Sequence, residues 1–394
     1  MAMKDLLAHI ERRIPPDKPE KKIVHPSKDE IFKLPCYPLR DNILSPNIPE
    51  DSKAQFSVMS YNILADCYAY NAGYWYCDSL DTVVRHESLM KELSILGYAT
   101  VLCFQEVTHK YFSYLLQPAL TSLGYEGIYQ QKDKRHKSSP KSEDGLAIFY
   151  NKHKCTLIST QPIILNQLMI EAWKGVVGNV RMEDSCYRDT VGLLTAFSID
   201  GQVVSIGNVH LHFDWMRPDI QSLQGCMCLG KLVEFANFHD SSGYVYCGDF
   251  NSQTFTELYT LLTCGYISAD SKQAFLHPSL SVSVKKTEFT KSKPHMIPYF
   301  QIFEKCYTIP QTVKSAYLTI QGSEPLYTNY TGDFHGCLDY IFYSEGLIPM
   351  SILALPDEKD MRSEVALPNS VMSSDHLSLK AEFNIVTTNK DNKI

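Results

Sequence analysis

Polar side chains recur at the ends of apolar, strand-like runs along this chain. Glu106 ends the run VLCFQE, and Asp249 and Asn251 end the run VYCGDFN. Ionisable groups set against strands this apolar are costly to bury unless a metal ion or hydrogen bonds compensate. Each alone has an ordinary explanation, as a turn former or a hydrogen-bonded core residue, so only the whole set makes a case. The candidates are Asn62, Glu106, His210, Asp249, Asn251, Asp339, Asp375 and His376.

Together these residue types match the needs of metal-assisted phosphodiester hydrolysis. The reaction requires a carboxylate to place Mg²⁺, a group to deprotonate the attacking water, and positive charge near the phosphate. We expect Glu106 to bind the metal, Asp249 to act as the base, and Asn251 to orient the water or the phosphate. His376 is expected to donate a hydrogen bond to a phosphate oxygen, with Asp375 fixing the local network.

A second oriented imidazole is expected from His210. It lies in SIGNVHLH, and Asp339 of GCLDYIF is its expected partner. The sequence gives the order and type of these residues but no distance, so this pairing is a hypothesis.

The elements that must position these residues alternate between strands and helices. Several of the apolar runs have a period of two, which is typical of sheets covered on one face. Strands are predicted over 56–65, 100–107, 145–151, 192–199, 202–212, 243–251, 338–344 and 377–386, and helices over 83–96, 110–123, 220–238 and 254–262. This mixture predicts one α/β domain, a four-layer α/β/β/α sandwich of two packed mixed sheets with helices outside.

The ends of the chain differ from this domain in composition. Residues 1–50 are rich in proline, which predicts an extended or disordered N-terminal extension. The catalytic domain is expected over 56–386, followed by a polar tail over 387–394. Loops are expected over 131–142, 169–189 and 271–312; the basic ones could touch a phosphate backbone, although a solvated loop is the commoner explanation.

Composition limits the classes of function. The chain has 394 residues, 44 acidic and 37 basic, for a net charge of −7, which argues against a simple electrostatic coat on nucleic acid. A metal-dependent enzyme escapes this objection because the metal faces the anion. The 12 cysteines are scattered without zinc-like spacing, as in a reducing compartment. No run is long enough to span a membrane and no secretory signal is seen, so a cytoplasmic location is expected, with nucleus or mitochondrion as alternatives.

Six short motifs give the chain a family likeness over residues 56–386. They are SYNIL (60–64), QEV (105–107), NVHLH (208–212), GDFN (248–251), LDYI (338–341) and SDH (374–376). With them the chain resembles the endonuclease/exonuclease/phosphatase superfamily, which has a deoxyribonuclease I-like fold. SYNILADCYA, DGLAIFY and YTNYTGDFHGCLDYIFYS are most similar to the carbon-catabolite-repressor type of deadenylases and their relatives nocturnin, the Angel proteins and 2′,5′-phosphodiesterase.

The resemblance implies roles for several residues. Glu106 would bind Mg²⁺ (Mn²⁺ is an alternative), and Asn62 would support that site through water. Asp249, Asn251 and His376 would surround a second metal site or the scissile phosphate, so the implied metal ligands are Glu106, Asp249 and Asn251. The implied substrate contacts are Asn208, Trp215 and Phe334, with Phe334 stacking on a base.

Two positions depart from the pattern of the deadenylases. Trp215 stands where the relatives carry a proline beside the substrate, and His335 stands where they carry a lysine. No leucine-rich repeat precedes the domain in this sequence, so docking through such a repeat is not expected.

The implied activity is that of a 3′-exoribonuclease releasing 5′-AMP from poly(A) or 2′,5′-linked oligoadenylate. Two alternatives stay open: a phosphatase acting on a nucleotide or cyclic RNA-end phosphate, and an inactive nuclease fold that binds RNA. The linkage cleaved, 2′,5′ or 3′,5′, depends on how the ribose lies over the metals and is not decided by the sequence.

Overall fold

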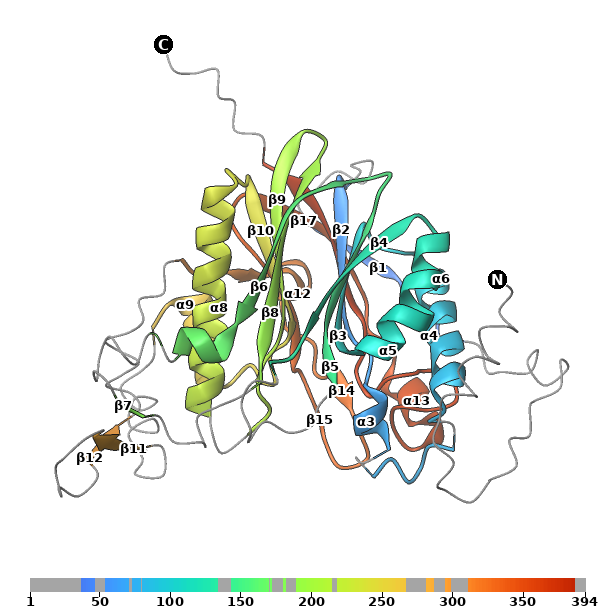
Figure 1. The fold of residues 1–394 in the computed structure, drawn as a ribbon. Helices are drawn as coiled ribbons and strands as arrows, with labels where there is room; N and C mark the ends of the chain where they lie inside the picture. Colours follow the sequence, from blue (N-terminus) through green and yellow to red (C-terminus); the bar gives the residue numbers. More distant parts are fainter. Residues whose placement is uncertain are drawn as a thin grey trace, which may run out of the picture.

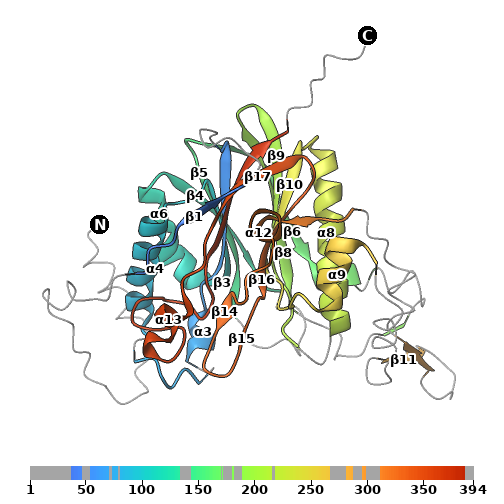
Figure 2. The same cartoon turned by 180° about the vertical axis from the view of Figure 1, so that it is seen from behind.

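The computed structural model describes residues 37–46, 54–70, 73–78, 80–133, 143–169, 171, 180–181, 189–214, 218–266, 281–286, 295–298 and 311–386. Within them two large sheets pack face to face and helices cover the outer face of each sheet (Figure 1). The predicted four-layer α/β/β/α sandwich is therefore confirmed. Figure 2 shows the same layers from behind.

The first sheet has seven strands in the spatial order β1-β17-β18-β2-β3-β5-β4. Strands β2 and β3 are parallel, and the other neighbours are antiparallel. The strands are β1 (Asn42–Leu44), β2 (Phe56–Asn62), β3 (Val101–Thr108), β4 (Tyr125–Gln131), β5 (Asp144–Asn151), β17 (Leu347–Leu353) and β18 (Leu379–Ile385).

The second sheet has six strands in the order β13-β16-β10-β9-β8-β6. Here β9 and β10 are parallel, which places their carboxyl ends at the same edge. The strands are β6 (Thr156–Ile164), β8 (Val191–Ile199), β9 (Gln202–His210), β10 (Gly243–Asp249), β13 (Lys314–Ser315) and β16 (Asp339–Tyr343).

Apolar side chains fill both sides of the central strands. Val58 of β2 faces Val245 of β10 in the core between the sheets, whereas the adjacent Met59 points the other way, toward Leu93. Because successive side chains of a strand point to opposite faces, a strand buried on both faces must be apolar throughout. The covering helices are α4 (Thr82–Leu96), α5 (His109–Tyr111), a π-helix (Phe112–Leu116) and α6 (Gln117–Ser122) on the first sheet, and α8 (Pro218–Phe238) and α9 (Glu257–Cys264) on the second.

Several smaller elements complete the fold. A hairpin of β14 (Asn329–Tyr330) and β15 (His335–Gly336) lies near α3 (Asp66–Ala69) at one end of the sandwich (Figure 1). Further helices among the described residues include α12 (Ala316–Gln321), α13 (Glu358–Met361) and a 3-10 turn (Arg362–Glu364). Among the described residues, no helix combines the length and the apolar character needed to cross a membrane.

Two of the expected loops contain strands. β7 (Val180–Arg181), β11 (Ser281–Lys286) and β12 (His295–Pro298) form a small three-stranded sheet, so the expectation of irregular structure over 169–189 and 271–312 is wrong in these parts. The alternating sequence SVSVKK of β11 carried the signal for a strand.

Candidate active site

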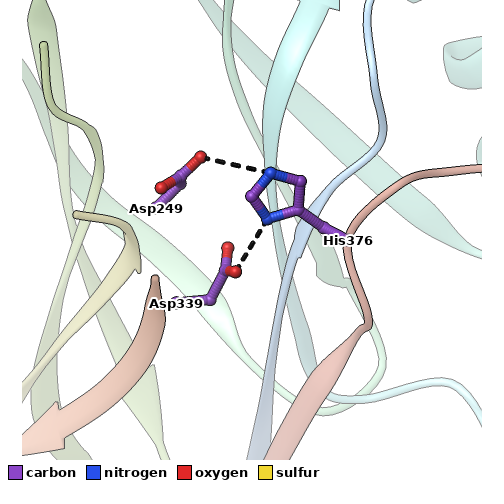
Figure 3. Close-up of side chains that lie close together, drawn as sticks. All are labelled: Asp249, Asp339 and His376. Atoms are coloured by element: carbon purple, nitrogen blue, oxygen red, sulfur yellow. Dashed lines mark hydrogen bonds and ion pairs between the residues drawn. The ribbon is translucent and has the colours of Figure 1, made fainter. Parts of the chain in front are cut away.

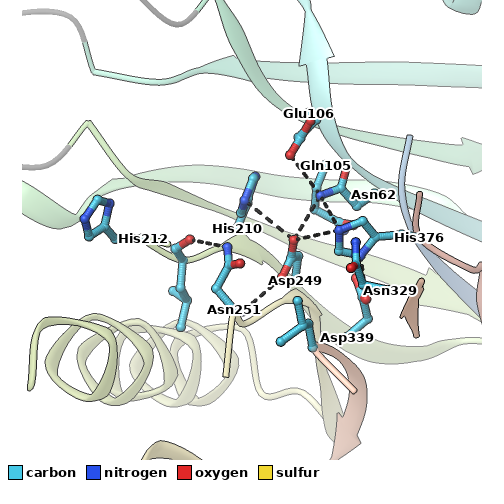
Figure 4. A network of polar contacts seen from close by, with 12 residues as sticks. Asn62, Gln105, Glu106, His210, His212, Asp249, Asn251, Asn329, Asp339 and His376 are labelled. Atoms are coloured by element: carbon cyan, nitrogen blue, oxygen red, sulfur yellow. Dashed lines mark hydrogen bonds and ion pairs between the residues drawn. The ribbon is translucent and has the colours of Figure 1, made fainter. Parts of the chain in front are cut away.

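The polar strand ends meet at one edge of the two sheets. In the second sheet, the register sets Asp249 of β10 beside His210 of β9 on one side and Asp339 of β16 on the other. In the first sheet, Asn62 ends β2 and pairs with Gln105, next to Glu106 of β3. Seven of the eight predicted catalytic residues appear in one polar network in Figure 4, and the eighth, Asp375, contacts Asn329 of that network.

The carboxylate of Asp249 is the centre of this network. Its Oδ2 accepts a hydrogen bond from Asn62 Nδ2 at 2.9 Å and lies 3.6 Å from His210 Nε2 and 3.7 Å from His376 Nε2. The side chain is buried, and burial together with the nearby charge of Asp339 raises its pKa to about 7. At neutral pH this carboxylate is therefore poised to exchange a proton.

His376 bridges two carboxylates rather than one (Figure 3). Its Nδ1 lies 2.7 Å from Asp339 Oδ2, and its other ring nitrogen faces Asp249. Burial opposes the charged imidazolium, but the carboxylates of Asp339 and Asp249 outweigh burial and raise the pKa of His376 well above its ordinary value. A protonated His376 can donate a hydrogen bond to an anionic ligand.

The predicted pairing of His210 with Asp339 is wrong. Asp339 pairs with His376, which arrives from the segment before β18, while His210 faces Asp249. Burial and the neighbouring charge of Lys132 lower the pKa of His210 well below its ordinary value. His210 is thus a neutral imidazole, unlike His376.

Glu106 faces Asp249 from the other sheet. Its Oε1 accepts from Asn62 Nδ2 at 3.1 Å, so one amide nitrogen contacts both carboxylates, and its Oε2 accepts from the backbone nitrogen of Ala65 at 2.9 Å. Burial and the carboxylates of Asp144 and Asp375 raise the pKa of Glu106 to about 7. Its backbone φ of 58° is unusual for a residue with a side chain, and such strain concentrates at functional sites.

Asn251 is held so that its side-chain oxygen is available. Its Nδ2 donates to Leu211 O at 2.9 Å and its backbone nitrogen donates to Asp249 Oδ1 at 2.9 Å. Gln221 of α8 donates to Asn251 O at 2.8 Å and fixes the same turn. Because the amide nitrogen is engaged, Oδ1 is the atom that Asn251 presents to a ligand.

Sequence reasoning missed the residues that hold Asp375 and Asp339. Asp375 Oδ2 accepts from Tyr74 Oη at 2.8 Å and from Asn329 Nδ2 at 3.0 Å. Thr328 Oγ1 donates to Asp339 Oδ2 at 2.6 Å. Thr328 and Asn329 lie in the quoted motif YTNYTGDF, but a threonine or asparagine beside a turn carries no signal of its own.

Lys132 was also missed as an individual residue. Its Nζ lies 2.8 Å from Asp144 Oδ2, and its side chain is 11% exposed. It lines the same cleft as Glu106 and His210. Lys132 directly follows β4, at the start of a segment that was expected to be a solvated loop, so its sequence position gave no sign of a role in the site.

The three predicted substrate contacts have different outcomes. Phe334 is 39% exposed and lines a cleft of about 830 Å³ together with Asp249 and His376. Asn208 lies elsewhere than expected, fully buried between the sheets, where its amide bonds Phe104 O at 3.0 Å and Gln105 Nε2 at 2.7 Å. It joins the sheets and does not face the cleft. Trp215 lies outside the described residues.

The donor atoms of the site suit a divalent metal ion. Glu106, Asp249 and Asn251 offer oxygen atoms from both sheets, which is the chemistry that hard cations select. Among the described residues, the buried Asp339 Oδ1 has no hydrogen-bond partner, and Asp249, Asp339 and His376 bring ligand atoms within 4.8 Å of one another. A bound cation would also offset the cost of burying Glu106 and Asp249, whose pKa values are both raised to about 7.

Comparison with known proteins defines the class. The model of the endonuclease/exonuclease/phosphatase family matches residues 59–376, and the chain belongs to this family. The family is generally dependent on divalent metals, in agreement with the donor set. The sequence-based assignment to this superfamily is thereby confirmed.

Within the family, the similar proteins include carbon catabolite repressor protein 4 homologs and 2′,5′-phosphodiesterases. The chain is 29% identical over 366 residues to carbon catabolite repressor protein 4 homolog 1 of Arabidopsis thaliana, covering 87% of this chain and 60% of the relative. It is 29% identical over 364 residues to human 2′,5′-phosphodiesterase 12, covering 87% of this chain and 53% of the relative. The chain thus spans only about half to three-fifths of the length of these relatives.

Solved structures of similar proteins share the fold of this chain. ANGEL2, described as a 2′,3′-cyclic phosphatase, superposes with a TM-score of 0.67 at 26% identity, covering 88% of this chain and 98% of ANGEL2. The catalytic domain of human Nocturnin gives a TM-score of 0.56 at 22% identity, covering 88% of this chain and 98% of that domain, and supports the shared fold alone.

Proposed function

We propose that this chain is a Mg²⁺-dependent phosphodiesterase that acts as a 3′-exoribonuclease on poly(A) or 2′,5′-linked oligoadenylate and releases 5′-AMP. The observation that carries the proposal is the buried Asp249 carboxylate, which contacts Asn62, His210 and His376 and faces Glu106 across the two sheets. The similarity to a carbon catabolite repressor protein 4 homolog and to a 2′,5′-phosphodiesterase supports the substrate class.

Each side chain has a role in the proposed reaction. Glu106, Asp249 and Asn251 would hold Mg²⁺ (Mn²⁺ also suits these oxygen donors), which supplies positive charge to the phosphate and makes a bound water more acidic. Asp249 takes the proton of the attacking water, and Asn62 Nδ2 fixes the position of that carboxylate. The water oxygen bonds to phosphorus as the bond to the departing ribose oxygen breaks, and that oxygen takes up a proton.

The two imidazoles act differently in this scheme. His376, kept protonated by Asp339, donates a hydrogen bond to a phosphate oxygen. His210 is neutral and sits beside Asp249, where its Nε2 can donate to the carboxylate. Asp375 is held by Tyr74 and Asn329 at the edge of the cleft, and Phe334 offers its half-exposed ring to a base.

A second candidate function is a phosphatase on a nucleotide or on a cyclic phosphate at an RNA end. It is favoured by one observation, the structural similarity to ANGEL2, a 2′,3′-cyclic phosphatase, at 26% identity. The same metal site would serve both reactions, so the substrate has to be decided by experiment.

The test uses the purified chain with Mg²⁺ and four substrates: 3′,5′-linked oligo(A), 2′,5′-linked oligo(A), RNA ending in a 2′,3′-cyclic phosphate, and NADPH. Progressive shortening with AMP release supports the exoribonuclease. Loss of the cyclic phosphate, or release of orthophosphate, without shortening supports the second candidate. Excess EDTA should abolish turnover and added Mg²⁺ should restore it. No turnover of any substrate, with RNA binding intact, would overturn both and indicate an inactive binding fold.

We also propose a cytoplasmic location and RNA as the binding partner. Several of the described cysteines are buried, among them Cys103, Cys155, Cys228 and Cys247, which suits thiols of a reducing compartment. Imaging of the tagged protein together with crosslinking to RNA would test both.

A further inference from the structure

One large aromatic side chain, next in sequence to two tyrosines that line the cleft, has no role in the reaction described above. Trp75 is 78% exposed, although it lies between Tyr74 and Tyr76, which both line the cleft. A single exposed apolar side chain is ordinary on a protein surface. Trp75 differs from such an isolated side chain because the tyrosines on both sides of it are anchored by hydrogen bonds.

The backbone of Trp75 is fixed from both sides. Tyr74 Oη donates to Asp375 Oδ2 at 2.8 Å, inside the active site. Tyr76 Oη donates to Leu367 O at 2.6 Å, and the Trp75 ring meets the Tyr76 ring edge to face at 5.6 Å. An exposed indole on an anchored backbone is a preorganised contact surface, because little freedom remains to be lost on binding.

The same tyrosine links Trp75 to the loop that carries Phe334. Gly332 N donates to Tyr76 Oη at 3.3 Å, and a Cβ on Gly332 would lie only 3.0 Å from the Tyr76 ring. Glycine at 332 therefore lets the Tyr76 ring close onto the loop between β14 and β15. Tyr76 therefore joins the segment of the exposed Trp75 ring to the loop that carries the exposed Phe334 ring.

The charges of the cleft favour stacking as the means of holding a longer strand. Among the described residues that line the cleft, Lys132 is the one lysine or arginine, and it is paired with Asp144. The whole chain carries a net charge of −7. Beyond the phosphate that is cleaved, the described lining therefore offers little positive charge to neutralise further phosphates of a strand, whereas aromatic stacking does not depend on charge.

We propose that Trp75 stacks on the base of a second nucleotide of the substrate, adjacent to the nucleotide whose base lies on Phe334. The proposal rests on the proposed function and sharpens it, because a second base exists in an RNA strand but not in a mononucleotide. Stacking tolerates every base, so this subsite selects for a single strand of two or more nucleotides rather than for a sequence.

The experiment compares Trp75→Ala, Trp75→Phe and a control, Phe238→Ala. Phe238 is 82% exposed at the end of α8 and is absent from the residues lining the cleft. The substrates are oligo(A) and the p-nitrophenyl ester of thymidine 5′-monophosphate, which has no second base. Trp75→Ala should raise the KM for oligo(A) about tenfold, with Trp75→Phe close to wild type. Neither variant should change turnover of the ester, and Phe238→Ala should change neither substrate.

Binding tests the subsite independently of turnover. In a Glu106→Ala background, anisotropy of labelled oligo(A) should show about tenfold weaker binding when Trp75 is also alanine, while competition by AMP should be unchanged. Equal binding with and without Trp75, or equal losses on oligo(A) and on the mononucleotide, would overturn the proposal. If the wild type turned over no substrate, the proposed function would fail, and the binding measurement would still decide the role of Trp75.

Discussion

At the scale of single residues, the site gathers carboxylates whose burial is expensive. Asp249→Asn removes the charge while keeping the shape. We expect activity to fall by about 10³-fold, because the variant lacks a base. Burial and Asp339 raise the pKa of Asp249 to about 7, so the neutral amide should also raise the melting temperature by a few degrees when EDTA is present. The measurements are kcat on oligo(A) and thermal unfolding.

The matched control for that substitution is Glu345→Gln, at a carboxylate whose side chain is 76% exposed. It should change neither activity nor melting temperature. A near-normal rate in Asp249→Asn would show that another group accepts the proton.

Thr328 positions a second carboxylate without touching the substrate. Its hydroxyl donates to Asp339 Oδ2 at 2.6 Å and accepts from the backbone nitrogen atoms of Leu338 and Asp339, both at 2.9 Å. Thr328→Val should lower kcat on oligo(A) about tenfold and destabilise the fold by about 1–3 kcal/mol, since buried donors lose their acceptor. Thr328→Ser, which keeps the hydroxyl, should restore both. Loss of stability with an unchanged kcat would show that Thr328 is only structural.

Sequence reasoning identified the types of residue in the site better than their partners. Asp249 stood out because it lies at the end of the apolar run VYCGDFN, and His376 because it directly precedes the run LSLKAEF. Which histidine meets Asp339 depends on the register of β10 with β16 and on the path of the segment before β18, and neither is local. The predicted substrate contact of Asn208 failed for the same reason. A polar residue on a strand suggested a site facing the cleft, but the other sheet covers this side chain.

At the scale of elements, one glycine sets how closely β10 can approach β9. Gly248 has a φ of 141°, and a Cβ there would meet Val209 O at 2.0 Å. Gly248→Ala should therefore destabilise the fold by about 3 kcal/mol or more and displace the adjacent Asp249. Gly230 lies on α8 with nothing within 4 Å of its Cβ, so Gly230→Ala should stabilise by about 0.5–1 kcal/mol. Urea titrations would compare the free energies of unfolding of the two variants. Equal changes in both would contradict the predicted clash at Gly248.

A buried histidine on α4 should make stability depend on pH. His86 is 6% exposed, its Nδ1 lies 2.9 Å from Tyr111 Oη, and burial lowers its pKa to about 4. The unfolded chain therefore takes up the proton first as the pH falls from about 6.5 to 4, and stability is lost in that window. His86→Gln should show a flatter fall in unfolding free energy between pH 7 and 5. The exposed His153→Gln is the control, and an unchanged slope in His86→Gln would contradict the assignment.

The sequence predicted those elements whose apolar residues contrast strongly with the polar residues on either side. Central strands such as β2 and β10 are buried along their whole length and read as apolar runs. Edge strands do not: β6, with the sequence TLISTQPII, is largely exposed and contains a proline, so it carries little pattern. The segment 110–123 was predicted as one helix but is divided by the π-helix at Phe112–Leu116, a hydrogen-bonding shift that residue types do not reveal.

At the scale of the whole molecule, the described part of the proline-rich N-terminal segment, residues 37–46, is joined to the sandwich. β1 lies within the expected extension over 1–50, yet it pairs with β17 at the edge of the first sheet. Just before it, Tyr37 Oη donates to Glu92 Oε1 at 2.7 Å, and Arg40 donates to Ser378 Oγ at 2.9 Å. This segment contacts residues that are distant from it in sequence, so its composition alone could not predict that it packs against the first sheet.

The last prediction follows from the buried carboxylate of that junction. Glu92 is 1% exposed and accepts hydrogen bonds from Tyr37, Tyr61 and Ser378, so loss of one donor leaves part of a buried acceptor unsatisfied. Tyr37→Phe should therefore lower the free energy of unfolding by about 1–3 kcal/mol in urea titrations. Leu39→Ala, at a side chain that is 86% exposed two residues away, should stay within about 0.5 kcal/mol of wild type. Because Tyr37 does not line the cleft, kcat on oligo(A) below the unfolding transition should be unchanged in both variants. A Tyr37→Phe protein as stable as wild type would mean that the segment rests on the sandwich without contributing to its stability.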